Sequence, residues 1–269
     1  MYLTKNYGFI GLGNMATAII KGMVHSGKFE AQHIYGMNRS YDKTNNLALT
    51  YNTQACSTIE ELMAKVDIVV LAVKPQILPT ILPTVRANLR KEQIIISIAA
   101  GKTLDYLHNH LGQDVTIFRV MPNINAVIGS STSCYSTKDT TSIAHKQLVE
   151  EMFETVGSIV ELPENLFSIF TTIGCASPAF TYLYIDSLAR AAVREGMPKQ
   201  MALEIAASSV LGSAKMILES NEHPMALVDQ VCSPGGTTIQ GVTSLQANRF
   251  EGVIHDAVTA VTKKDHSLQ

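Results

Sequence analysis

The sequence predicts an α/β fold in which a doubly wound parallel sheet is followed by an all-helical unit. The chain begins with a short apolar strand, a glycine turn and an amphipathic helix. Apolar runs of strand length then alternate with helical patterns, and after Pro163 helical patterns continue without a convincing strand. We therefore expect an α/β domain over residues 1–161 and a helical domain over residues 162–269.

Composition limits the classes of function. Of the 269 residues, 46% are hydrophobic and only 16% are charged, which indicates a compact protein that buries apolar surface between subunits. The net charge of −2 and the absence of a basic run argue against nucleic acid and anionic membranes as partners. The chain opens without a signal-peptide pattern, and no apolar run approaches the ~18 residues that span a bilayer, so a cytoplasmic location is expected.

No metal site is expected. The histidines His108 and His110 lie close together in the sequence, but such a pair on a helix surface is more often solvated than metal-binding. The cysteines are scattered without the paired spacing of zinc or redox motifs, which indicates reduced, mostly buried thiols. They are Cys56, Cys134, Cys175 and Cys232.

The first candidate site is the turn that follows the N-terminal strand. Gly11-Leu12-Gly13-Asn14-Met15-Ala16 fits the G-x-G-x-x-A pattern of a dinucleotide-binding turn between a strand and a helix. Gly11 would make the tight bend, Gly13 would let a pyrophosphate approach the backbone, and Ala16 would pack close to the strand. With Asn14 and Met15, these glycines are the expected cofactor contacts here. A purely structural glycine turn is the alternative.

The end of the second strand indicates which dinucleotide binds. The predicted strand over residues 33–37 ends at Asn38-Arg39-Ser40, where an NAD-specific enzyme usually carries a carboxylate for the ribose hydroxyls. Arg39 can pair with a 2′-phosphate, and Asn38 and Ser40 can donate hydrogen bonds to it. We therefore expect NADPH as the cofactor, with NADH as the second choice. A solvent-exposed loop arginine is the structural alternative.

Two further strands should end at the same ligand-binding edge. The apolar run over residues 66–73 ends in Lys74-Pro75-Gln76, so the cofactor is expected along Ala72, Val73, Lys74 and Pro75. Lys74 either contacts phosphate or closes the strand. The strand over residues 94–98 stops at Ala99-Ala100-Gly101, where small side chains would let a flat ring or a substrate approach closely. Between these strands, Pro79 and Pro83 predict a broken helix.

The remaining elements follow from similar patterns. A strand over residues 115–120 leads to Met121-Pro122-Asn123, and residues 130–136 also have strand character. Residues 142–155 are typical of a helix, and residues 158–160 of an edge strand.

The sequence of the C-terminal part predicts helices that pack against a second subunit. Pro178 suits a helix's first turn, Gly196 a helix C-terminus, and Pro198 the start of the next helix. Small residues over 206–214 suit close helix–helix contact. A helical unit this apolar is more easily explained by a dimer interface than by a monomeric bundle.

Ser233-Pro234-Gly235-Gly236-Thr237-Thr238 forms the second candidate site. It places a glycine turn and two hydroxyls directly before a helical pattern. Converging backbone N–H groups and the partial positive charge of a helix N-terminus could bind a small carboxylate without an arginine. An ordinary loop with a helix cap is the alternative.

Together these motifs resemble those of the pyrroline-5-carboxylate reductase family over essentially the whole chain. The motifs are residues 8–16, 72–76, 119–123, 177–180 and 233–238. The resemblance implies reduction of L-1-pyrroline-5-carboxylate to L-proline by NAD(P)H, the last step of proline synthesis. It also implies an N-terminal Rossmann domain and a C-terminal dimerisation domain, with dimers commonly built into larger rings.

For this substrate, we expect a specific role for each residue of the second candidate site. The backbone N–H groups of Gly235, Gly236 and Thr237 and the Ser233 hydroxyl would hold the carboxylate. The Thr238 hydroxyl would orient the ring nitrogen. The nitrogen can arrive protonated, so no strong general acid is needed, in agreement with motifs almost free of Asp, Glu and His. Catalysis would then depend on proximity and alignment.

Two departures from the family pattern stand out. Ile124-Asn125-Ala126 follows Asn123, where the family usually has Thr-Pro, and Cys175-Ala176-Ser177 replaces Gly-Ser-Gly before Pro178-Ala179. The first departure leaves the loop after Asn123 less rigid.

Two other functions are alternatives to the reductase activity. A dehydrogenase of the β-hydroxyacid type would need a lysine general acid on an early helix of the second domain, and residues 177–194 contain none. A non-catalytic, nucleotide-binding regulatory homologue is the second alternative, because the residues after Asn123 are altered.

Overall fold

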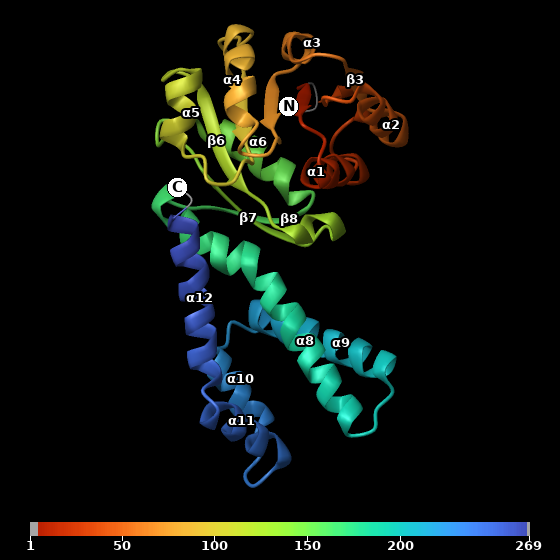
Figure 1. Ribbon diagram of the computed structural model, residues 1–269, viewed down its shortest axis with the longest axis vertical. Helices are drawn as coiled ribbons and strands as arrows, with labels where there is room; N and C mark the ends of the chain where they lie inside the picture. The colour runs from red at the N-terminus through yellow and green to blue at the C-terminus, as the bar shows by residue number, and fades with distance from the viewer. Residues whose placement is uncertain (1–4, 268–269) are drawn as a thin grey trace. The chain divides into compact units, whose positions relative to one another are not determined.

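The computed structural model describes residues 5–267, which form two compact units. The first unit runs from the start of the described chain to Cys175 and takes in the end of the chain from Asp265. The second unit is Ala176–Lys264. The first is a sheet covered by helices and the second consists of helices alone (Figure 1). The predicted fold class is confirmed.

The first unit is built on an eight-stranded sheet of order β3-β2-β1-β4-β5-β6-β7-β8. Strands β1 to β6 are parallel, β7 is antiparallel to β6, and β8 is parallel to β7. Since the chain winds outward on both sides of the β1–β4 pair, the ligand crevice is expected at the carboxyl ends of these strands. The strands are β1 (Tyr7–Ile10), β2 (Ile34–Met37), β3 (Gln54–Cys56), β4 (Ile68–Leu71), β5 (Ile94–Ser97), β6 (Thr116–Met121), β7 (Ser131–Ser136) and β8 (Gly157–Glu161).

Helices cover both faces of this sheet, which explains its nearly continuous apolar strands. In β4, Ile68 and Val70 belong to one core cluster, whereas Val69 and Leu71 belong to the other. Helices α1, α2 and α6 pack on the first cluster, and α3, α4 and α5 pack on the second. The elements are α1 (Asn14–His25), η1 (Ala31–His33), α2 (Tyr41–Tyr51), α3 (Ile59–Lys65), α4 (Leu78–Ala87), α5 (Leu104–Leu111), η2 (Ile124–Ile128) and α6 (Ile143–Glu154).

The prediction of a broken helix at Pro79 and Pro83 was wrong. Helix α4 is continuous from Leu78 to Ala87, with Pro79 in its first turn, where no N–H donor is needed. Pro83 removes one hydrogen bond from the helix interior. Burial of Leu78, Leu82 and Val85 on one helical face offsets that loss.

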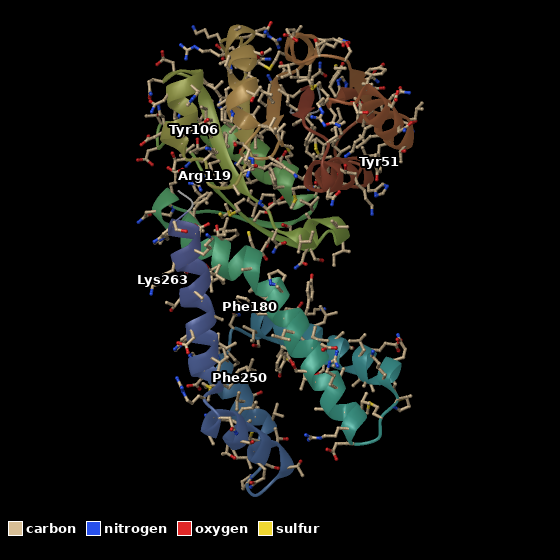
Figure 2. All side chains as sticks on the ribbon, viewed as in Figure 1. Tyr51, Tyr106, Arg119, Phe180, Phe250 and Lys263 are labelled. Atoms are coloured by element: carbon tan, nitrogen blue, oxygen red, sulfur yellow. The ribbon has the colours of Figure 1, made fainter. Side chains whose placement is uncertain are left out.

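A buried ion pair anchors the segment that follows the sheet. Arg119 of β6 is 4% exposed, and its Nη1 donates to Glu164 Oε1 at 2.8 Å. The same carboxylate oxygen accepts the N–H of Leu104 at 2.8 Å, at the start of α5. The Arg119 guanidinium, labelled in Figure 2, also lies 4.4 Å from the centre of the Phe167 ring. Glu164 therefore joins three elements. The segment consists of η3 (Glu164–Leu166), α7 (Phe167–Phe170) and the π-helical turn η4 (Thr171–Ala176).

The second unit leaves much of its apolar surface exposed. Helices α8 and α9 form a hairpin whose contact uses the buried alanines Ala189, Ala202 and Ala206. Gly196, at φ +99°, ends α8 as predicted. Large side chains such as Leu211 remain 71% exposed. The helices are α8 (Ser177–Arg194), α9 (Lys199–Ser220), α10 (Pro224–Val231), α11 (Thr237–Ala247) and α12 (Phe250–His266).

Two helical stretches are long and apolar enough to cross a membrane, contrary to the prediction that none would be. They are Glu164–Arg194 and Lys199–Ser220, each of which contains an 18-residue window with a mean hydropathy of 1.3 and 1.4, respectively. The prediction considered uninterrupted apolar runs, whereas these stretches reach the average with polar residues dispersed among alanines and leucines. Length and composition are weak evidence, because a helix that packs against another subunit has the same features.

We predict that Glu164→Ala lowers the free energy of unfolding by about 3 kcal/mol, because it leaves Arg119 buried without its partner. Denaturant unfolding followed by circular dichroism would measure the loss. Glu195→Ala is the matched control, since the Arg194 and Glu195 side chains are 80% and 73% exposed. It should cost under about 1 kcal/mol. Equal losses in the two variants would contradict the prediction.

Candidate active site

The turn between β1 and α1 requires glycine at its first position. Gly11 has φ +96°, and its N–H donates to the Met37 carbonyl oxygen at 2.8 Å. A methyl group on Gly11 would lie 2.8 Å from the carbonyl oxygen of Ala72. The turn therefore passes close to the chain after β4, and a larger residue would push these segments apart.

Gly13 shows the opposite environment. It is exposed, and a methyl group placed on it would meet no atom within 4 Å. Gly13 is the N-cap of α1, and no side chain caps the helix, so the N–H groups of Asn14 and Met15 have no intrahelical acceptor. Open space above uncapped donors fits the pyrophosphate of a dinucleotide.

The three predicted phosphate-binding residues follow β2. Asn38 is half-buried, whereas Arg39 and Ser40 are exposed. Ser40 is the N-cap of α2, and its hydroxyl makes no capping hydrogen bond. Within residues 5–267, Arg39 forms no ion pair. Its charge is therefore available to a ligand.

The predicted residues after β4 and β5 lie at the same edge of the sheet as the β1–α1 turn, because β4 pairs in parallel with β1 and β5 pairs in parallel with β4. The N–H of Ala72 donates to the Ile10 carbonyl oxygen at 2.9 Å, so the chain after β4 stays paired with β1. Val73 and Pro75 are half-buried and Lys74 is exposed. Ala99 is only 4% exposed and its side chain belongs to the core, so its backbone is the part that a ligand could reach.

No functional role was predicted from the sequence for two polar residues that lie in β6 and directly after it. Arg119 and Asn123 are 4% and 5% exposed, and both bind the segment after the sheet. Their positions at the two ends of the Arg-Val-Met-Pro-Asn motif were a usable signal, since polar residues that flank a buried strand need buried partners.

The second candidate site, Ser233–Thr238, lies in the helical unit and is described by itself. Pro234 and Gly235 occupy the centre of a turn that the Gly236 N–H closes by donating to the Ser233 carbonyl oxygen at 3.0 Å. Gly235 has φ +69°, as a type II turn requires at this position. The Gly236 N–H, which is predicted to bind substrate, is engaged inside the turn in this structure.

Gly236 serves instead as the N-cap of α11, which no side chain caps. The first residues of the helix, Thr237 and Thr238, are exposed, and their N–H groups lack intrahelical acceptors. A methyl group on Gly236 would lie 2.3 Å from Ser233 Oγ, so the serine hydroxyl lies directly against Gly236. The hydroxyl of Ser233 and the first donors of α11 thus lie next to each other.

Thr238 also lines a cavity of about 720 Å³ within the helical unit. Most of the lining is apolar and comes from several helices, including Tyr184 of α8, Met216 of α9 and Leu227 of α10. Thr238 and Ser213 are among its polar members. Such a lining fits apolar side chains of a packing partner better than a small polar substrate.

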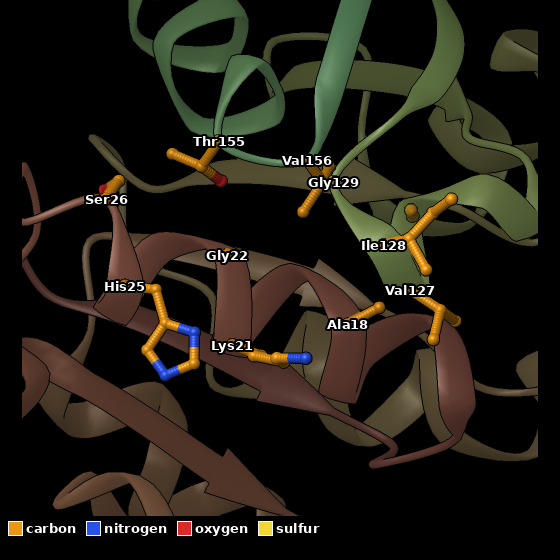
Figure 3. A pocket seen from close by; sticks show the side chains of 11 residues that line it. Ala18, Lys21, Gly22, His25, Ser26, Val127, Ile128, Gly129, Thr155 and Val156 are labelled. Carbon is orange, nitrogen blue, oxygen red and sulfur yellow. The ribbon is translucent and has the colours of Figure 1, made fainter. Parts of the chain in front are cut away.

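Another cavity, of about 340 Å³, lies in the first unit between α1 and η2 (Figure 3). Lys21 and His25 line it from α1, and Val127 and Ile128 line it from η2. These α1 residues belong to its C-terminal half, away from the dinucleotide turn. Across residues 5–267, no cluster of His, Cys, Asp and Glu side chains could hold a metal ion.

Comparison with known proteins connects both sites to one family. The family model for pyrroline-5-carboxylate reductase dimerisation matches residues 164–268, and the model for NADP oxidoreductase, coenzyme F420-dependent, matches residues 6–101. The pyrroline-5-carboxylate reductase of Escherichia coli (strain K12) is 36% identical over 266 residues, which cover 99% of each chain. The chain belongs to the pyrroline-5-carboxylate reductase family.

Solved structures of pyrroline-5-carboxylate reductases share this fold. The enzyme from Coxiella burnetii has a TM-score of 0.94 at 29% identity, with 99% of each chain covered. The pyrroline carboxylate reductase of Plasmodium falciparum, solved with NADP bound, has a TM-score of 0.86 at 29% identity, with 98% of each chain covered. The helical unit of our chain is thus the dimerisation domain of the reductase family, which accounts for its exposed apolar side chains.

We predict that Gly13→Ala folds normally but binds NADPH at least about tenfold more weakly, a loss of ~1.4 kcal/mol. The added methyl group meets no protein atom, yet it occupies the space expected for the pyrophosphate. Fluorescence titration with NADPH and thermal unfolding would measure the two properties. Gly11→Ala is the contrasting variant, which should lose stability because of its contact with Ala72. An unchanged dissociation constant for Gly13→Ala would show that this turn does not hold the cofactor.

Proposed function

We propose that this enzyme reduces L-1-pyrroline-5-carboxylate to L-proline with NADPH, the last step of proline synthesis, and that Thr238 and Ser233 act on the substrate. The observation that carries the activity is family membership over the full chain, from the dinucleotide turn to the dimerisation domain. Loss of reduced-nicotinamide absorbance with purified protein, NADPH and pyrroline-5-carboxylate would test it. Absence of turnover by folded protein would refute it.

The cofactor is NADP(H), and the first unit fits it. Gly11, Gly13, Asn14 and Met15 would hold the pyrophosphate through backbone N–H groups, and the backbone at Ala72–Pro75 and Ala99 would lie along the rest of the molecule. When bound, NADPH supplies the hydride that reduces the C=N bond. The exposed, unpaired Arg39, supported by Asn38 and Ser40, would bind the 2′-phosphate.

The Ser233–Thr238 turn would hold the substrate carboxylate. The N–H groups of Gly235 and Thr237 provide donors there, because the Gly236 N–H is occupied within the turn. The Ser233 hydroxyl lies beside them, and the positive end of the α11 dipole favours an anion at this place. The Thr238 hydroxyl would then orient the ring nitrogen for reduction at the neighbouring carbon. These residues position the substrate and transfer no proton themselves.

The assembly follows from the dimerisation domain. The chain forms a homodimer through residues 164–268, and we extend this to a larger homo-oligomer located in the cytoplasm. Support for a larger assembly comes from side chains that remain exposed in the helical unit, such as Leu218 at 82%. For the functional domains we keep a boundary near residue 161, where β8 ends. Sedimentation velocity would distinguish a dimer from a larger oligomer.

We predict that Arg39→Asp reverses or removes the preference for NADPH over NADH. The substitution removes the cation expected at the 2′-phosphate and adds a carboxylate that repels it, which should cost ~1.5–3 kcal/mol in discrimination. The ratio of kcat/KM values for the two cofactors measures this change. Lys43→Asp on the exposed side of α2 is the matched charge control and should leave the ratio unchanged. An unchanged ratio in Arg39→Asp would overturn the assignment.

We predict that Thr238→Ala lowers kcat by ~10- to 100-fold, or ~1.4–2.7 kcal/mol, with a smaller change in KM for the substrate. The backbone donors survive this substitution, whereas the orienting hydroxyl is lost. Thr238→Ser should recover much of the rate. Thr243→Ala is the control in the same helix, since the Thr243 hydroxyl donates within α11, at 2.9 Å from the Ile239 carbonyl oxygen. Turnover at the parent rate by Thr238→Ala would make its hydroxyl irrelevant to catalysis.

A further inference from the structure

The turn Met121-Pro122-Asn123 at the carboxyl end of β6 is docked on the π-helical turn η4. Asn123 Nδ2 donates to the Gly174 carbonyl oxygen at 2.8 Å, and both residues are buried. The Cys175 thiol donates to the Pro122 carbonyl oxygen at 3.8 Å. The Thr171 hydroxyl oxygen lies 3.0 Å from Met121 Sδ. Each residue of the turn thus contacts one residue of η4.

The Asn123 contact satisfies a buried carbonyl group of η4. Gly174 is buried, and its carbonyl oxygen accepts the Asn123 amide group. A buried carbonyl without a donor costs free energy, so this hydrogen bond constrains the turn and η4 relative to each other. It joins residues that lie 51 positions apart in the chain.

The rest of Asn123 shapes the turn. Its Oδ1 accepts the N–H of Asn125 at 3.1 Å, which caps η2, and its own N–H donates to Ser131 Oγ at 3.1 Å. Both polar atoms of the side chain are thereby bonded to protein, so Asn123 holds the backbone of the turn. Burial raises the pKa of the Cys175 thiol to about 11, which keeps it protonated as a donor to the same turn.

The location of the turn gives this docking a functional meaning. Strand β6 is the parallel neighbour of β5. If the 2′-phosphate binds beyond β2 and the pyrophosphate at β1, the nicotinamide half of the cofactor would lie toward β4, β5 and β6. A displacement of about 1 Å in a positioning element can lower a rate about 100-fold. π-helical turns are rare, and those that occur are frequently found at functional sites.

We infer that Asn123 is a positioning residue for hydride transfer, which acts by holding the turn after β6 on η4 through the Gly174 carbonyl group. The inference rests on the reductase activity proposed above. Nothing in the dinucleotide turn or in the Ser233–Thr238 turn requires this contact.

The test uses Asn123→Asp in the full-length enzyme. The substitution keeps the oxygen that caps η2 and removes the donor to Gly174. Asn88→Asp is the matched control: Asn88 Nδ2 donates to the Thr84 carbonyl oxygen at 2.9 Å at the C-terminal end of α4, away from the ligand edge. We expect kcat to fall by about 10- to 100-fold in Asn123→Asp while the NADPH dissociation constant changes less than about threefold. The deuterium isotope effect on kcat with NADPD should be at least as large as in the parent.

A second readout needs no turnover. Hydrogen exchange of the cofactor-free protein should become faster in residues 121–129 and 171–178 of Asn123→Asp and remain unchanged there in Asn88→Asp. Asn123→Ala covers a failure of Asn123→Asp to fold. It removes the same donor without placing a charge beside the Gly174 carbonyl group, and kcat should again fall while NADPH binding is preserved.

Two results would overturn the inference. They are a kcat within about twofold of the parent, or a loss of kcat no larger than in Asn88→Asp. A parent enzyme that fails to reduce pyrroline-5-carboxylate would refute the proposed function instead. The two failures are therefore distinguishable in one set of assays.

Discussion

The uncapped start of two helices underlies the two ligand sites that we propose. Both α1 and α11 begin at a glycine N-cap, Gly13 and Gly236, and neither receives a capping hydrogen bond from a side chain. In α3, by contrast, the Thr58 side chain accepts one of the first N–H groups of the helix. Leaving these groups free costs stability in the absence of ligand. It also leaves donors and a positive dipole end that suit a pyrophosphate at one helix and a carboxylate at the other.

Both glycine caps depend on packing that the surrounding chain provides. Gly11 lets the β1–α1 turn pass within contact distance of Ala72, and Gly236 lets the Ser233 hydroxyl cover the start of α11. In each turn, one glycine lies close to other atoms, Gly11 or Gly236. A second glycine, Gly13 or Gly235, has open space around it in which a ligand would fit. The same division explains why the sites contain almost no acidic or basic side chains: the backbone supplies the donors, and the fold directs them.

Apolar surface has different meanings in the two units. In the α/β unit, apolar strands are covered on both faces, and Ile68 and Val69 of β4 lie in separate cores. In the helical unit, side chains of similar size such as Leu183 and Leu211 remain 68% and 71% exposed. A dimerisation domain explains this exposure, because these helices complete their core with a second chain. The membrane-like hydropathy of α8 and α9 follows from the same requirement.

The sequence alone determined the fold class, the dinucleotide turn and the Ser233–Thr238 turn, because each depends on local patterns: period, glycine spacing and a helix start. Tertiary structure decided what local patterns do not contain. It showed that α4 stays regular despite Pro83, since burial of Leu82 and Val85 outweighs one lost hydrogen bond. It also showed that the Gly236 N–H closes its own turn. The partner of Asn123 could not be predicted from sequence, because Gly174 is distant in the chain and only folding brings its buried carbonyl group to the Asn123 side chain.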